Sequence, residues 1–194
     1  MAAFALLIVY IAYQHILPVQ MEAVEYFEKR DYFHIFMATL KVGIPGAYLW
    51  LAFFYLVFHL SCNLSAELTR FADCRFYSDW WNAGDLGEYW RKWNYPIHFW
   101  LARHVHYPLV RRGFNAELAL LLTFTFSALF HEYLVIGTFR VANGLAFTFM
   151  MVNIPLIYLQ KVLKKTVSAS HNNFLFWLCY AVIGQPFGFL FCYY

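Results

Sequence analysis

The stretch Thr123-Phe-Thr-Phe-Ser-Ala-Leu-Phe-His131-Glu-Tyr-Leu-Val-Ile136 is an apolar run that carries two adjacent ionisable residues, His131 and Glu132. It belongs to a longer apolar segment, residues 116–139, which is long enough to cross a bilayer core as an α-helix. Ionisable side chains at bilayer depth are costly unless they pair or face a wet cavity. We therefore interpret His131 as a functional residue; the alternative is a histidine that bridges helices by hydrogen bonds.

The composition also indicates a membrane protein. Of the 194 residues, 62% are hydrophobic and 13% are charged, whereas an ordinary soluble domain has about 25% charged residues. Aromatic residues make up 23%, which suits rings placed at the headgroup level. The net charge of +3 is too small to indicate nucleic-acid binding. The 4 cysteines have no paired spacing, so we expect from them neither a disulfide framework nor a metal site.

The apolar segments predict an all-α fold, a multi-pass transmembrane helical bundle with interfacial amphipathic helices. Spans are expected at about residues 2–17, 44–64, 116–139, 141–159 and 173–194. Pro18 is expected to end the first span, and a charged loop over residues 22–41 is expected to follow. The segment 65–115 has no apolar run long enough to cross, so we expect it to lie at the cytosolic interface, with helices over 85–93 and 97–112.

Lysine and arginine set the expected orientation. The segment 65–115 and the loop after residue 159 lie on one side of the predicted bundle, and together they carry ten of the 14 basic residues. Because basic loops face the cytosol, an anionic substrate from the cytosol would meet this side first. The chain opens directly into an apolar run and stops in another, so we expect it to be part of a longer multi-pass protein.

Two polar groups have the chemistry of a catalytic site. Ser127 and His131 are one helical turn apart and share a face, whereas Glu132 points about 100° away from His131. A neutral imidazole in dry surroundings can act as a general base on a hydroxyl, and burial favours that uncharged form. Asn94 precedes Tyr95-Pro96, where the chain is expected to bend and to present the amide to a ligand. A simple turn-forming asparagine is the alternative.

Other polar residues are open to two interpretations. Gln185 interrupts the last apolar segment within Gly184-Gln-Pro186, and it either lines a cavity or bonds to a neighbouring helix. The run Asp79-Trp-Trp-Asn82 is by composition an interfacial anchor. The histidines at 98, 104 and 106 fit no common zinc pattern, so we expect no metal site and interpret them as residues on the surface of an amphipathic helix.

Three strings resemble the membrane-bound O-acyltransferase superfamily, in its sterol and diacylglycerol O-acyltransferase branch. Phe76-Tyr-Ser-Asp-Trp-Trp-Asn82 is similar to the FYxDWWN signature of that branch. Ser127-Ala-Leu-Phe-His-Glu-Tyr133 resembles the helix with the family's catalytic histidine, and Trp93-Asn-Tyr-Pro-Ile-His98 resembles the segment with its active-site asparagine. The proline in the latter, Arg111-Arg-Gly113 and the Gly-Gln-Pro run are similar to the diacylglycerol side of the branch. The resemblance identifies residues 1–194 as the C-terminal part of the family's domain.

The resemblance implies transfer of a fatty acyl group from acyl-CoA to the hydroxyl of a neutral lipid in the endoplasmic reticulum membrane. The implied acceptor is diacylglycerol, which gives triacylglycerol, and a sterol is the alternative. The implied catalytic residues are His131 as general base and Asn94 as its partner. Residues implied to line the active chamber are Glu132, Gln185, Ser127 and Trp93. Residues implied to bind acyl-CoA are Phe76, Tyr77, Asp79, Trp80, Trp81, Asn82, Arg103, Arg111 and Arg112.

One departure concerns the CoA phosphates. The diacylglycerol branch tends to carry basic residues just after the Arg-Arg-Gly turn, but residues 114–121 here include Glu117 and neither lysine nor arginine. The arginines at 103, 111 and 112 are the expected substitutes.

The expected partners are acyl-CoA as co-substrate, a neutral lipid acceptor and membrane lipid, with no cofactor and no nucleic acid. A homo-oligomer is compatible with the sequence. Two other functions remain open: a proton-coupled multi-pass transporter that uses His131 and Glu132 as a relay, and an inactive truncated paralogue.

Overall fold

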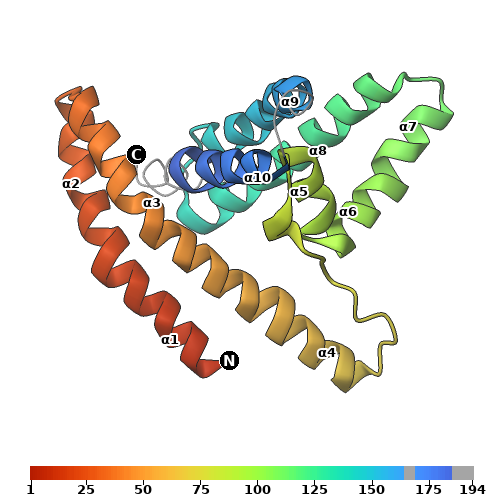
Figure 1. Cartoon of the computed structure of the whole chain (residues 1–194), viewed down its shortest axis with the longest axis horizontal. Helices are drawn as coiled ribbons and strands as arrows, with labels where there is room; N and C mark the ends of the chain where they lie inside the picture. The colour runs from red at the N-terminus through yellow and green to blue at the C-terminus, as the bar shows by residue number, and fades with distance from the viewer. Residues whose placement is uncertain (164–168, 185–194) are drawn as a thin grey trace. The chain divides into compact units, whose positions relative to one another are not determined.

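The computed structural model describes residues 1–163 and 169–184, which are mostly helical and contain no strand (Figure 1). Four helices in this described part are long and apolar enough to cross a membrane: Ala2–Glu28, Tyr32–Thr69, Ala116–Thr138 and Leu145–Val162. The predicted multi-pass helical membrane fold is thus confirmed. The chain divides into two compact units, residues 1–76 with the segment from Trp177 (unit 1) and residues 77–176 (unit 2).

The first helix of unit 1 is longer than predicted. Helix α1 (Ala2–Ile11), a π-helical turn (Ala12–Ile16) and α2 (Leu17–Glu28) follow one another without a break. The prediction that Pro18 ends the helix was wrong because Pro18 lies in the first turn of α2, directly after the π turn. A wider turn there accommodates a residue that lacks an N–H and would clash with the preceding carbonyl.

The predicted charged loop over 22–41 is also wrong, since most of it is helical. The chain reverses at residues 29–31, where Arg30 has a left-handed φ of 54°. Asp31 then caps α3 (Tyr32–Phe54) by accepting a hydrogen bond from the backbone N–H of His34 at 3.1 Å. This bond and one from the His34 ring hold the pKa of Asp31 below its usual value. Helix α3 continues through a π-helical stretch (Tyr55–Ser61) into α4 (Cys62–Thr69).

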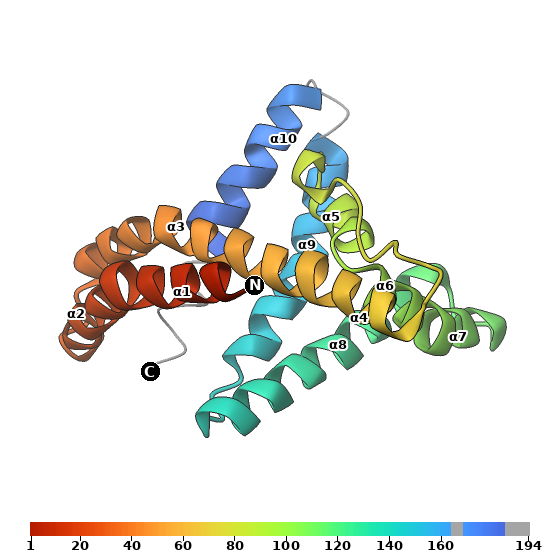
Figure 2. The ribbon, with the colours of Figure 1, turned by 90° about the horizontal axis from the view of Figure 1, so that it is seen from below.

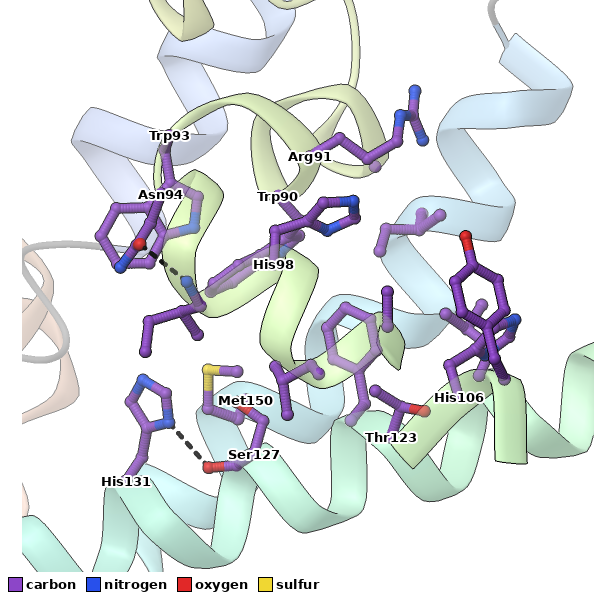
Figure 3. A pocket seen from close by; sticks show the side chains of 18 of the residues that line it. Trp90, Arg91, Trp93, Asn94, His98, His106, Thr123, Ser127, His131 and Met150 are labelled. Carbon is purple, nitrogen blue, oxygen red and sulfur yellow. Dashed lines mark hydrogen bonds between the residues drawn. The ribbon is translucent and has the colours of Figure 1, made fainter. Parts of the chain in front are cut away.

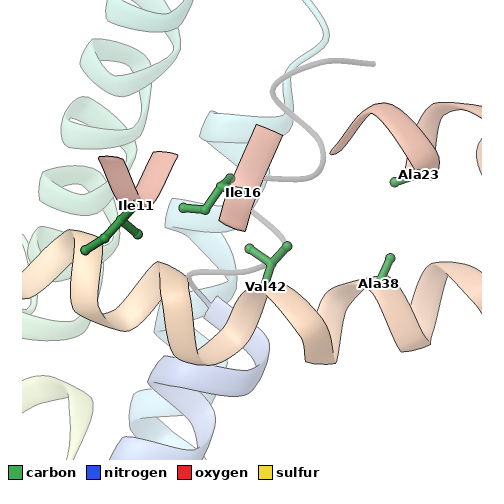
Figure 4. Packing of buried hydrophobic residues seen from close by; sticks show 5 residues of the cluster. All are labelled: Ile11, Ile16, Ala23, Ala38 and Val42. Carbon is green, nitrogen blue, oxygen red and sulfur yellow. The ribbon is translucent and has the colours of Figure 1, made fainter. Parts of the chain in front are cut away.

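Small and branched side chains form the core between these helices. Ile11, Ile16 and Ala23 are buried against Ala38 and Val42 of α3 (Figure 4). Alanines at the contact let the helix backbones approach closely, which is how membrane helices gain packing energy.

Unit 2 contains the long helices α8 (Ala116–Phe139) and α9 (Leu145–Leu163), which pack against each other (Figure 2). Helix α8 has the predicted bounds, whereas α9 begins four residues later than predicted, after Gly144 with its φ of 72°. Before them come α5 (Leu86–Lys92), α6 (Tyr95–Leu101), a π-helical turn (Ala102–His106) and α7 (Tyr107–Arg111). The two helices expected in the segment 65–115 are therefore present. Helix α10 (Ala169–Leu178) follows α9, and the last predicted span extends beyond the described residues.

Candidate active site

A cavity of about 400 Å³ lies in unit 2 between α5, the α6–α7 helix, α8 and α9 (Figure 3). This volume is within the range of small-ligand sites. Much of its wall is apolar, from Ile97, Leu101, Leu120, Phe124, Met150 and Ile157. The polar and charged lining residues include Arg91, Asn94, His98, Thr123, Ser127, His131 and Lys161. The structure therefore brings His131, Asn94, Ser127 and Trp93, all named from the sequence, to one cavity.

His131 is half-buried on α8, and its ring is held by its own helix. Nδ1 lies 2.8 Å from the backbone carbonyl oxygen of Ser127, one turn earlier. A carbonyl oxygen can only accept, so Nδ1 carries the proton and donates it. In the neutral ring Nε2 then has the free lone pair, which is the form that a general base needs. Figure 3 shows the ring extending from α8 toward the part of the cavity where Asn94 lies.

Asn94 is buried at the start of α6, where it is the N-cap residue. Its Oδ1 accepts a hydrogen bond from the backbone N–H of Ile97 at 3.1 Å. Because the N–H must donate to oxygen, this bond also fixes which end of the amide is the NH₂ group. Nδ2 remains as a donor that the cap does not use. Pro96 lies in the first turn of α6, where its missing N–H costs no helical hydrogen bond.

His98 lines the same cavity and is half-buried, which differs from the surface position expected for it. Burial lowers its pKa, and the positive charge of Arg91 lowers it further. Both effects favour the neutral imidazole. His98 is thus a neutral polar group near Arg91 at physiological pH.

The profile of the MBOAT, membrane-bound O-acyltransferase family matches residues 1–193. The chain belongs to this family. It is 44% identical over 149 residues to "Diacylglycerol O-acyltransferase 1-1" of Oryza sativa subsp. japonica, which is 76% of this chain and 28% of that relative. It is 38% identical over 158 residues to "Diacylglycerol O-acyltransferase 1" of Arabidopsis thaliana, which is 81% of this chain and 30% of that relative. It is 37% identical over 184 residues to the protein of the same name from Dictyostelium discoideum, which is 95% of this chain and 29% of that relative. The chain thus spans less than a third of the length of these curated relatives.

Glu132, expected in the active chamber, has a different place in this family member. Its two carboxylate oxygens accept hydrogen bonds from the backbone N–H groups of Gly144 at 2.8 Å and Phe147 at 3.1 Å. These donors are at the N-terminus of α9, where a negative charge is favourable. Among the described residues that line the cavity, Glu132 is not found. Gln185, the other expected polar lining residue, lies outside the described residues.

The segment Phe76 to Asn82, which the resemblance assigns to acyl-CoA, does not line the cavity in the described part of the chain. Trp80 is fully buried and packs edge-on against Tyr89, with ring centroids 5.7 Å apart. The amide of Asn173 on α10 donates to the carbonyl oxygens of Trp81 and Ala83, both at 2.9 Å. In this family member the signature therefore anchors the start of α5.

Asp79 of the same segment is paired with Lys92 at 2.9 Å. Lys92 also contacts Glu88 at 2.9 Å and thus bridges two carboxylates. Hydrogen bonds from Lys92 and Ser78 hold the pKa of Asp79 below its usual value, and the bonds to Asp79 and Glu88 raise the pKa of Lys92. Asp79 therefore forms an ion pair with the last residue of α5 and is not among the described residues that line the cavity.

The arginines at 103, 111 and 112, expected to bind phosphate, are exposed and do not line the cavity formed by the described residues. The cations that do line it are Arg91 on α5 and Lys161 on α9, which the sequence interpretation missed. Helical spacing could have identified them only if the faces of α5 and α9 that turn toward the cavity were known. Those faces depend on how the two helices pack.

Two amides of α9 hold α5 in place. Gln160 accepts a hydrogen bond from the backbone N–H of Leu86 at 2.7 Å, and Asn153 accepts one from the indole N–H of Trp90 at 3.3 Å. The two α9 residues are seven positions apart, which is close to two helical turns and places them on one face. They set the position of α5, and through it the start of α6 at Asn94.

Proposed function

We propose that the protein that contains this chain transfers a fatty acyl group from acyl-CoA to the hydroxyl of diacylglycerol and so produces triacylglycerol. The family membership and the names of the relatives support an O-acyltransferase that acts on a neutral lipid. The observation that carries the proposal is the pair formed by His131 and Asn94. A base nitrogen and an amide donor, each fixed by a backbone hydrogen bond, line the same cavity.

In the proposed reaction the hydroxyl oxygen of the acceptor attacks the thioester carbonyl, and Nε2 of His131 takes the hydroxyl proton. The carbonyl oxygen becomes an oxyanion, which accepts a hydrogen bond from Nδ2 of Asn94. When the carbonyl re-forms, the carbon–sulfur bond breaks and the CoA thiolate takes the proton from the imidazolium of His131. A thioester is already activated, so this direct transfer needs no acyl-enzyme and no cofactor.

The walls of the cavity fit a reaction between two lipid-like substrates. Ile97, Leu101, Phe124 and Met150 provide an apolar surface beside His131 and Asn94. Such a wall holds an acyl chain and excludes water, which would otherwise compete as the acceptor. We propose that the lipid acceptor enters from the bilayer and that CoA enters from the cytosolic side of the endoplasmic reticulum membrane.

The transporter alternative loses its main support at Glu132. A proton relay through adjacent His131 and Glu132 needs a carboxylate that is available to exchange protons. Here both carboxylate oxygens accept backbone N–H groups of α9. Both oxygens of the carboxylate are thereby engaged at the start of α9.

The test uses membranes from cells that express the complete gene, as wild type or with His131→Ala. Labelled acyl-CoA is added, and the labelled lipids are separated so that triacylglycerol and sterol esters are distinguished. We expect His131→Ala to lose all but a few per cent of acyl transfer with normal membrane insertion. His104→Ala is the matched control, because His104 is exposed and lies outside the cavity lining. If a correctly inserted His131→Ala protein retains substantial transfer, His131 is not the general base. If the label appears in sterol esters and not in triacylglycerol, the acceptor is a sterol and not diacylglycerol.

A further inference from the structure

Two cations line the cavity without a carboxylate partner. Arg91 on α5 and Lys161 on α9 are both lining residues. Within residues 1–163 and 169–184, neither forms an ion pair. The ammonium of Lys161 lies 5.2 Å from the centre of the Tyr158 ring, a contact that leaves its charge available to an anion. Both residues are exposed, and positive charge that forms no ion pair at the wall of a largely apolar cavity indicates an anionic ligand.

The neighbouring lysine shows that this charge is specific to the cavity side of α5. Lys92 is bound to Asp79 and Glu88, both at 2.9 Å, so its charge is already balanced. Arg91 precedes it by one position, about 100° around the helix, and faces the cavity. Its field is felt by His98, another lining residue, whose pKa it helps to lower.

Gly87 lies where the Arg91 side chain of α5 approaches α9. A Cβ atom on Gly87 would lie 3.5 Å from Nη1 of Arg91 and 3.5 Å from Cγ2 of Ile157. The guanidinium therefore lies over the point where α5 meets α9. Lys161 is one helical turn after Ile157 and shares its face. Oδ1 of Asp85 is also near Gly87, at 3.2 Å from the same Cβ position, but it already accepts the backbone N–H of Glu88 at 2.7 Å.

We propose that Arg91 and Lys161 form an anion subsite that binds the phosphate groups of the acyl donor. The inference rests on the proposed function, in which the donor is a CoA thioester. Such a donor has phosphates at one end, an apolar chain at the other and the reacting thioester between them. Figure 3 shows Arg91 across the cavity from His131, which matches this order. Arginine suits a phosphate because its planar guanidinium donates two parallel hydrogen bonds, and lysine adds a point charge.

The experiment compares two donors in membranes that contain the complete protein. Octanoyl-CoA carries the phosphates, and S-octanoyl-pantetheine carries the same thioester without them. For each of Arg91→Gln and Lys161→Gln we expect the KM for octanoyl-CoA to rise about tenfold, as for loss of one charge-assisted hydrogen bond. We expect kcat to stay within about twofold, and kcat/KM for the pantetheine thioester to stay unchanged.

Charge-conserving variants provide the matched controls. Arg91→Lys and Lys161→Arg should recover most of the affinity for octanoyl-CoA, which a purely structural role would not predict. Arg140→Gln removes an exposed cation of unit 2 that lies outside the cavity lining, and it should leave both donors unaffected. An unchanged KM in the Arg91→Gln, Lys161→Gln double variant would overturn the subsite. An equal loss for both thioesters, or a larger KM increase in Arg103→Gln, would overturn it as well.

Binding of CoA alone separates this inference from the proposed function. Titration calorimetry of the purified protein should show CoA binding that is weakened at least tenfold in the double variant. A wild-type protein that shows this difference but transfers no acyl group to lipid would refute the proposed function and retain the subsite. Equal binding of CoA by wild type and double variant would refute the subsite even if acyl transfer is normal.

Discussion

Asn94 has two roles that a set of substitutions can separate. Its Oδ1 caps α6 through the backbone N–H of Ile97 at 3.1 Å, and its Nδ2 is proposed to stabilise the oxyanion. Aspartate and serine are both good N-cap residues, so Asn94→Asp and Asn94→Ser keep the cap while they remove the amide donor. Asn94→Ala removes the cap and the donor together. The four proteins therefore distinguish a catalytic contribution from a structural one.

The expected magnitudes differ for the two roles. Loss of an N-cap side chain costs about 1 kcal/mol, so Asn94→Ala should lower the free energy of unfolding by that amount. Asn94→Ser should stay within a few tenths of a kcal/mol of wild type, whereas Asn94→Asp also buries a negative charge and should be less stable. Loss of one oxyanion donor lowers kcat by about 10²–10³, and all three variants should show it. Asn94→Asp should show the largest loss, because it places a negative charge where the oxyanion develops.

The assays are acyl transfer from labelled acyl-CoA in membranes and thermal unfolding of the purified protein in detergent. We expect activity to be lost in all three variants, whereas the unfolding temperature should fall in Asn94→Ala and stay at the wild-type value in Asn94→Ser. Asn94→Ser is the decisive variant, because it adds no charge to a buried position. If Asn94→Ser retains more than a tenth of the wild-type kcat, the side chain serves only to start α6 and the oxyanion role is refuted.

Two further predictions concern the carboxylates near the site. Glu132→Ala removes the acceptor of two backbone N–H groups, those of Gly144 and Phe147, and should lower the free energy of unfolding by about 2 kcal/mol, measured by thermal unfolding. Glu132→Gln keeps one acceptor oxygen and should lose less; equal stability of all three proteins would contradict the capping role. A hydrogen bond from Lys92 lowers the pKa of Asp79 in the folded protein. The ionised Asp79 therefore stabilises the fold at pH values above its unfolded pKa of about 3.9, and this stabilisation is lost as the pH falls through its pKa in the folded protein. Asp79→Asn should therefore be less stable than wild type at pH 6 and should lose less stability on acidification to pH 3, and parallel pH curves would contradict the pairing.

The sequence sufficed to predict elements that are defined by local signals. Helix α8 has the predicted bounds, since its apolar run is uninterrupted and is preceded by Asn115, whose side chain caps it at 2.7 Å from Leu118 N. The end of the first helix at Pro18 was mispredicted, because a π-helical turn removed the steric reason for a break. Charge over residues 22–41 was a poor signal for a loop. Exposed helical residues there form ion pairs such as Lys41 with Glu22, at 3.7 Å.

The site could be predicted only in part, for a similar reason. His131 and Asn94 stand out as polar groups whose type and setting carry chemistry, and they line one cavity. The partners of Glu132 lie 12 and 15 residues away, across the turn before α9, so no helical spacing indicates them. Arg91 and Lys92 are adjacent and chemically alike. Which of them faces the cavity depends on the rotation of α5 against α9, and that is set by tertiary packing.

The two orientations that the proposed chemistry needs are nevertheless encoded over very short distances in the chain. The tautomer of His131 is fixed by a carbonyl four residues earlier, and the amide of Asn94 is fixed by an N–H three residues later. Each arrangement uses a backbone group of the helix that carries the residue: a carbonyl one turn earlier for His131, and an unpaired N–H of the first turn for Asn94. Tertiary packing then has only to bring two helices together, and the hydrogen bonds of Asn153 and Gln160 supply that constraint from α9. Substitutions on α9 should therefore change the distance between base and donor, and with it kcat, without changing the tautomer of His131 or the orientation of the Asn94 amide.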